Sequence, residues 1–234
     1  MRQSLNSAFT TWTDLLLGGE NSAIPWTKHL QVRALGFCLL TIAAGVGAYG
    51  FSMGLWNSPT MAFYLALKLP LIIVITLSVN ALINGVLAQL LGSRLSFPQT
   101  WFAILSSFTI FALVVGALSP ITIGMALEVP ASDSEAAGET HRRLLVFHTL
   151  IIGLGGFAAT CRLLRLFEHF CPNRRSAIRC VVGLLAGNLF VGAQISFLMR
   201  PILCQPGLPV EFLRPDMFTG NFYESVIWAL KHSF

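Results

Sequence analysis

The sequence predicts an all-α fold, a polytopic integral membrane helical bundle of about five transmembrane helices with an amphipathic helix at each end. Of the 234 residues, 55% are hydrophobic and only 11% are charged, whereas soluble domains carry about 25% charged residues. Several apolar runs reach the length of about 20 residues with which a helix crosses the hydrocarbon core. The charged residues cluster at the ends of these runs, where they anchor to lipid headgroups and set topology.

The same composition limits the possible partners and cofactors. The net charge of +5 lies at span ends, so we expect the lipid bilayer as a partner and no nucleic acid. The five cysteines show no CxxC and no paired metal-ligand spacing, so we expect neither a metal nor another cofactor. The first 33 residues are too polar to form the apolar core of a cleavable signal.

Residues 1–30 are predicted to form an interfacial amphipathic arm. Leu5, Phe9, Trp12 and Leu16 recur every three or four residues, which gives one apolar helical face with aromatic residues at headgroup depth. Gly18 and Gly19 would end this helix. An alternative stays open, in which the arm packs against a partner subunit.

The transmembrane bundle is expected over residues 31–200. Ser58 and Pro59 predict a helix start, with serine as the N-cap and proline at the first helical position. The apolar run that follows exceeds one straight span, so we expect residues 61–66 to lie near an interface and Pro70 to kink the helix before the second span. A re-entrant path through this run, with six spans, is the alternative. The five expected spans are about 34–53, 71–91, 100–125, 144–161 and 180–199.

The connections and the tail are predicted from polar residues and prolines. Residues 128–140 hold four carboxylates among small residues, which is typical of a solvated, flexible loop. The tail is residues 201–234, on the non-cytoplasmic side, and its prolines exclude one regular helix over 201–215. Asn221 and Glu224 then resemble a capping box at the start of a second amphipathic helix that lies on the membrane.

Two pairs of glycines have the spacing at which transmembrane helices approach closely. Gly50 and Gly54 form one GxxxG pair, and Gly183 and Gly187 form the other. We interpret both pairs as helix-packing positions within the protein rather than as homodimer contacts.

Polar side chains inside the spans are candidates for a polar pathway or for contacts between helices. Lys68 is the strongest candidate, because an ionisable side chain inside the membrane costs free energy and is therefore usually functional. Its alternative role is to snorkel to the headgroups. Buried amides commonly bond between helices, and a lone histidine is more often packed than a ligand. The candidates are Lys68, Asn80, Asn84, His148, Asn188 and Gln194.

The distribution of arginine and lysine predicts the orientation. Arg174, Arg175 and Arg179 lie together between the fourth and fifth spans, and short cytoplasmic loops are enriched in such residues. We therefore expect a cytoplasmic N-terminus and an outside C-terminus, in a bacterial inner membrane.

This layout of a polar cytoplasmic N-terminus, five closely spaced spans and an outside C-terminus resembles the Yip family of membrane proteins over about residues 30–200. That family carries an Asp-Leu-Tyr-Gly-Pro signature, of which this chain has only Tyr49 and Gly50. The resemblance implies a five-span fold and a trafficking role, and it assigns no functional residues here.

The sequence favours a non-catalytic role. It contains no nucleophile elbow, P-loop or HExxH, and we expect no enzyme. The first hypothesis is an integral membrane subunit or scaffold of a larger complex, with other membrane protein subunits as partners. The alternative is a small transporter or channel with a polar pathway near the second span.

Overall fold

The computed structural model describes residues 32–203 and 209–232, so the predicted N-terminal arm (1–30) lies outside the described residues. The described chain is helical and confirms the all-α prediction. Five of its helices are long and apolar enough to cross a membrane. The elements are α3 (Val32–Leu55), α4 (Pro59–Leu90), α5 (Phe97–Glu128), α6 (Ala137–Phe170), α7 (Arg174–Leu198) and the shorter α8 (Phe222–His232).

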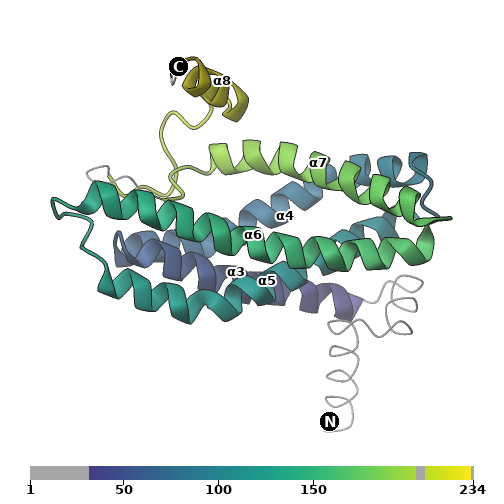
Figure 1. Cartoon of the computed structure of the whole chain (residues 1–234), viewed down its shortest axis with the longest axis horizontal. Helices are drawn as coiled ribbons and strands as arrows, with labels where there is room; N and C mark the ends of the chain where they lie inside the picture. The colour runs from purple at the N-terminus through teal and green to yellow at the C-terminus, as the bar shows by residue number, and fades with distance from the viewer. Residues whose placement is uncertain (1–31, 204–208, 233–234) are drawn as a thin grey trace, which may run out of the picture.

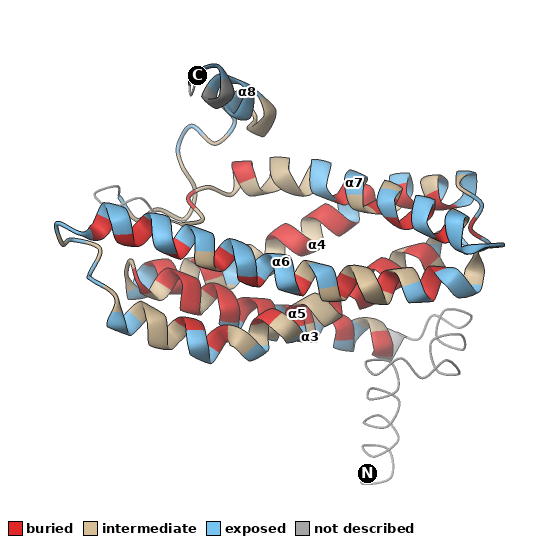
Figure 2. Cartoon of the chain, viewed as in Figure 1, coloured by how far each residue is buried: buried red, intermediate tan, exposed pale blue. Residues whose placement is uncertain are grey.

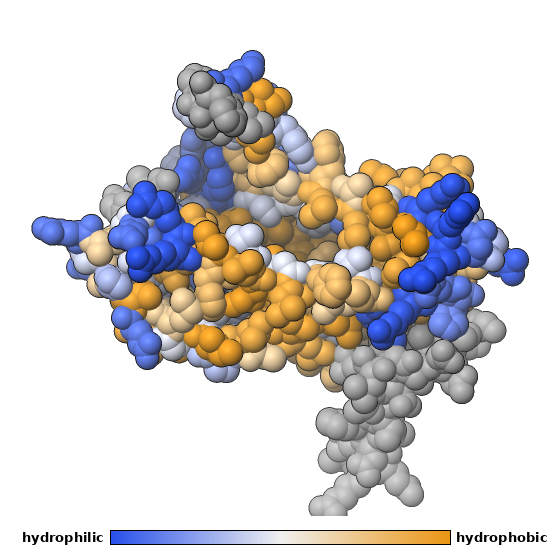
Figure 3. Space-filling model, in the orientation of Figure 1, coloured by the Kyte–Doolittle hydropathy of each residue, from blue (hydrophilic) through white to orange (hydrophobic). Residues whose placement is uncertain are grey.

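The five long helices lie side by side along the long axis of the molecule, and α8 lies off the side of this bundle (Figure 1). α3 packs most extensively against α4 and α5, while α7 packs against α4 and α6. On the face shown in Figure 3, hydrophilic residues gather at both ends of the bundle and hydrophobic residues cover its middle. This distribution is the one that a bilayer imposes on a spanning protein.

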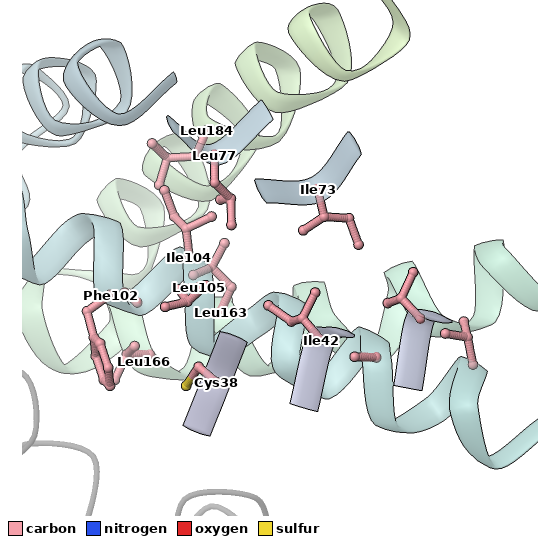
Figure 4. Close-up of a cluster of buried hydrophobic side chains, with 14 of the residues drawn as sticks. Cys38, Ile42, Ile73, Leu77, Phe102, Ile104, Leu105, Leu163, Leu166 and Leu184 are labelled. Atoms are coloured by element: carbon pink, nitrogen blue, oxygen red, sulfur yellow. The ribbon is translucent and has the colours of Figure 1, made fainter. Parts of the chain in front are cut away.

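Every long helix contributes to one buried core. Figure 4 shows Ile42 of α3, Leu77 of α4 and Leu105 of α5 pointing toward Leu163 of α6 and Leu184 of α7. Burial follows the inner side of each helix, and exposed residues follow the outer side (Figure 2). Large apolar side chains such as Leu82 and Leu150 are exposed, as expected for positions that face lipid.

The predicted helix starts have the expected caps. The Ser58 side chain accepts a hydrogen bond from the backbone N–H of Met61, and Pro59 occupies the first turn. At α8, the Asn221 side chain accepts from the N–H of Glu224 at 2.9 Å. These side chains satisfy N–H groups that have no partner within the helix.

Residues 61–66, predicted to lie near an interface, and the second span belong to one helix. α4 runs as one 32-residue helix that includes Pro70. Proline removes the hydrogen bond to the Ala66 carbonyl, and its ring crowds that carbonyl. α3 also approaches this carbonyl closely, since a Cβ on Gly47 would lie 3.2 Å from it.

The fourth span is also longer than predicted, because α6 has 34 residues and includes the charged positions that flank the apolar run 144–161. Residues 129–136, the connection before α6, make two hydrogen bonds to the turn that follows α3. The Trp56 indole N–H donates to the Pro130 carbonyl at 2.9 Å, and the Ser132 hydroxyl donates to the Asn57 carbonyl at 3.2 Å. This loop is therefore held against the turn between α3 and α4.

Candidate functional site

Three buried amides meet where α4 crosses α7. The Asn80 side-chain NH2 donates to the Gly187 carbonyl at 3.0 Å and to the Asn188 side-chain oxygen at 3.1 Å. Asn84, one turn further along α4, donates to the same Asn188 oxygen at 3.1 Å. The structure thus brings three of the predicted polar residues together, at positions that are 1–8% exposed.

Two oxygens of this α4 face have no hydrogen-bond partner among the described residues. They are Asn84 Oδ1 and Thr76 Oγ1, both buried. Glycines of α7 lie beside them: a Cβ on Gly187 would be 3.5 Å from Asn84 Oδ1, and a Cβ on Gly192 would be 3.6 Å from Thr76 Oγ1. The sequence analysis missed Thr76, although its spacing of four residues from Asn80 places it on the same helical face.

Lys68 is buried, and its ammonium reaches residues beyond the end of α7. Its side chain is 0% exposed, and Pro201 and Phe212, both beyond the end of α7, contact its ammonium. The ammonium donates to the Pro201 carbonyl at 2.8 Å and lies 5.2 Å from the centre of the Phe212 ring. A carbonyl dipole and an aromatic face both stabilise a buried cation. Lys68 therefore fastens the chain after α7 to α4.

His148 belongs to a second polar cluster, between α3, α5 and α6. Its Nδ1 lies 2.8 Å from the Tyr49 hydroxyl, with which it forms a hydrogen bond. Nearby on α3, the Ser52 hydroxyl donates to the Tyr49 carbonyl at 2.6 Å and accepts from Thr122 of α5. The sequence analysis missed Tyr49 as a partner, since 99 residues separate it from His148 and no local pattern links them.

Gln194 does not join the amide cluster. Its side-chain oxygen accepts from the backbone N–H of Phe222 at 3.0 Å, at the start of α8. The next residue, Tyr223, stacks on Phe190 of α7 with ring centres 4.6 Å apart and donates its hydroxyl to the Phe190 carbonyl. Gln194 is thus a contact between α7 and α8.

The predicted glycine pairs both face α4 but in different ways. A Cβ on Gly50 would lie 2.4 Å from the Leu65 carbonyl oxygen, and one on Gly54 would lie 2.6 Å from the Met61 carbonyl oxygen. α3 and α4 therefore touch backbone to backbone at this pair. At Gly183 the nearest atoms belong to the Leu91 and Leu87 side chains, at 3.0 and 3.2 Å, so that pair accommodates side chains instead.

Another set of small residues faces outward, on α6. Gly153 and Gly156 have no atom within 4 Å of an added Cβ, and Gly153 is exposed. Thr149 and Thr160 extend this row by one turn at each end, with hydroxyls bonded to the carbonyls of their own helix. We call Thr149, Gly153, Gly156 and Thr160 the α6 seam.

Titratable groups outside the spans show the effect of burial. Burial raises the pKa of the Cys171 thiol, and this effect exceeds the lowering by its hydrogen bonds with Cys180 and Ser93. Burial also lowers the pKa of Arg200, and the neighbouring Arg214 acts in the same direction, against Asp216. Within the described ranges, no group of three or more His, Cys, Asp or Glu side chains could hold a metal ion.

The fold and these contacts define the class of the protein, an α-helical membrane protein. No family model, curated protein or solved structure matches the chain.

Proposed function

We propose that this protein is a non-catalytic integral membrane subunit or scaffold of a larger membrane complex. The observation that carries the proposal is a contrast between glycines packed against neighbouring helices and glycines that face outward. Gly45, Gly50, Gly54 and Gly116 are already filled by backbone of neighbouring helices. The α6 seam has the same small-residue character and faces outward with open space at Gly153 and Gly156. Such rows allow a helix of another chain to approach closely.

The use of the polar side chains supports a structural role. Tyr49 and His148, the three amides of α4 and α7, and Lys68 with the Pro201 carbonyl each join two different elements. Hydrogen bonds between membrane helices contribute about 0.6–2 kcal/mol each. Together they would hold the bundle in one arrangement, as a scaffold requires.

A pair of glycine substitutions tests the proposal. Gly153→Leu fills the α6 seam, whereas Gly124→Leu on α5 is the matched control, because a Cβ there also meets no atom within 4 Å. The wild-type protein is extracted in a mild detergent, and subunits present at fixed stoichiometry are identified by mass spectrometry. We expect Gly153→Leu to lose a subunit that Gly124→Leu retains, with both variants folded.

Two results would contradict the proposal. One is a wild-type protein that purifies alone and is active by itself. The other is an identical subunit composition for Gly153→Leu and wild type, since the seam would then serve only as lipid-facing surface.

A small transporter or channel is the second candidate, favoured by the buried, unpartnered oxygens of Asn84 and Thr76 at the α4–α7 crossing. These acceptors would line a polar pathway between the two helices, near Lys68. In that case Asn84→Leu, combined with Lys68→Leu, abolishes flux in liposomes while the protein remains folded. Unchanged flux, or no flux in the wild type, removes this candidate.

The proposed location is a bacterial inner membrane, with a cytoplasmic N-terminus and the C-terminus outside. Arg174, Arg175 and Arg179 support this orientation, because they lie in the first two turns of α7, next to the α6–α7 connection, which would face the cytoplasm. The Yip-like layout fits the same arrangement of spans and remains part of the proposal.

A further inference from the structure

A groove between α7 and α8 has features of a ligand site that the scaffold proposal does not use. Its volume is about 420 Å³, within the range of about 300–1,000 Å³ that is typical of small-ligand sites. Ala193 and Phe197 of α7 form one wall, and Phe222 and Val226 of α8 form the other. Ile202 closes the side, and Arg200 is the charged residue of the lining.

The walls of the groove are fixed by specific contacts. Gln194 holds the first residue of α8, and the Phe190–Tyr223 stack lies beside it. Arg200 is also held in place: its Nε donates to the Phe197 carbonyl at 2.7 Å, and its guanidinium lies 3.3 Å from the centre of the Phe197 ring. The guanidinium is therefore positioned over the apolar wall before any ligand arrives.

The position of Arg200 relative to the membrane favours one kind of ligand. α7 crosses the apolar middle of the bundle and ends at Leu198, so Arg200 lies at the level where lipid headgroups meet the hydrocarbon. Arg214 is close enough to lower the pKa of Arg200 by like-charge repulsion, and Asp216 offsets it in part. No carboxylate among the described residues forms an ion pair with Arg200. An anion at this point would relieve the repulsion between the two guanidinium groups.

We propose that the α7–α8 groove binds a membrane phospholipid, with an acyl chain against Phe197, Phe222 and Val226 and the phosphate on Arg200. Apolar walls fit the chain, and a planar guanidinium fits a phosphate through paired hydrogen bonds. A bilayer supplies this ligand at the depth at which the groove opens. The site does not depend on the α6 seam, so each proposal can fail without the other.

Lipid binding to the purified, delipidated protein tests the proposal by native mass spectrometry. The probes are phosphatidylglycerol, diacylglycerol with the same acyl chains, and glycerol 3-phosphate. We expect phosphatidylglycerol to bind at least about tenfold more tightly than diacylglycerol. This ratio corresponds to the lower end of the free energy that a hydrogen bond to a charged group contributes. Glycerol 3-phosphate is expected not to displace it, because it lacks the chain.

Variants separate the charge from the groove. Arg200→Gln is expected to weaken phosphatidylglycerol binding about tenfold and to leave diacylglycerol unchanged, while Arg200→Lys keeps most of the binding. Ala193→Phe fills the groove and is expected to weaken both lipids. Arg142→Gln is the matched control, an exposed arginine on α6 outside the groove, and is expected to change neither. Thermal unfolding of each variant identifies any loss of fold.

Three outcomes would overturn the lipid site. They are equal binding of phosphatidylglycerol and diacylglycerol, equal losses for Arg200→Gln and Arg142→Gln, and displacement of the lipid by glycerol 3-phosphate alone. The last outcome would indicate a site for a soluble phosphate.

Discussion

Gly50 is the position at which a single methyl group should perturb the bundle most directly. In Gly50→Ala, the new Cβ would lie 2.4 Å from the Leu65 carbonyl oxygen and 2.8 Å from its carbon, whereas ordinary contacts begin near 3.4 Å. α3 and α4 would have to separate by about 1 Å, because both atoms belong to the backbone and cannot rotate away. Overpacking of this kind costs about 1–3 kcal/mol.

The matched control is Gly36→Ala on the same helix. Gly36 is exposed, and an added Cβ there meets no atom within 4 Å. Alanine should therefore show only its better helix propensity, a gain of about 0.5–1 kcal/mol. The two variants carry the same chemical change and are expected to shift stability in opposite directions.

Reversible unfolding in mixed micelles, followed by helical circular dichroism during a titration with sodium dodecyl sulfate, measures both free energies. Gly50→Ala should unfold at lower detergent fraction than wild type, and Gly36→Ala at an equal or higher fraction. Equal shifts for the two variants would refute the close α3–α4 contact. A stabilising effect of Gly50→Ala would refute it as well.

Three further perturbations have expected results. Lys68→Met removes the ammonium from the Pro201 carbonyl and the Phe212 ring. The rate of hydrogen exchange over residues 209–215 should therefore rise about tenfold, which corresponds to the lower end of the free energy of a hydrogen bond to a charged group. An equal change in the exposed-lysine control Lys231→Met would contradict this expectation. Tyr49→Phe and His148→Phe should show a coupling of about 1 kcal/mol in a double-mutant cycle, and additive effects would exclude the contact at 2.8 Å. Burial raises the pKa of the Cys171 thiol, and the thiolate is the form that reacts with a maleimide. The rate of Cys171 alkylation should therefore rise at a higher pH than the rate for a cysteine in a free peptide. Coincident pH profiles would count against this burial.

The sequence predicted the elements whose signals are local. Ser58 with Pro59 and Asn221 with Glu224 combine a capping side chain with a helical run, and both caps are present. Apolar length predicted the five spans. The ends of α6 were not predicted, because its terminal turns are charged and leave the hydrophobic run while the helix continues.

The contacts of the candidate site depended on which helices become neighbours. Asn80 and Asn84 share a helical face by spacing alone, but only the crossing of α4 and α7 brings Asn188 to both of them. Pro201 and Phe212, both beyond the end of α7, contact the buried Lys68 ammonium, and no pattern around Lys68 predicts these contacts. The same holds for Pro70, where close packing of α3 at Gly47 accompanies an unbroken helix.

The mass of the native particle, extracted in a mild detergent and measured by light scattering, tests the scaffold proposal most directly. The proposal predicts a particle larger than one 25.5 kDa chain with its detergent and lipid, containing another membrane subunit at fixed stoichiometry. A single chain that supports flux by itself in liposomes would contradict the scaffold proposal and favour the polar pathway between α4 and α7.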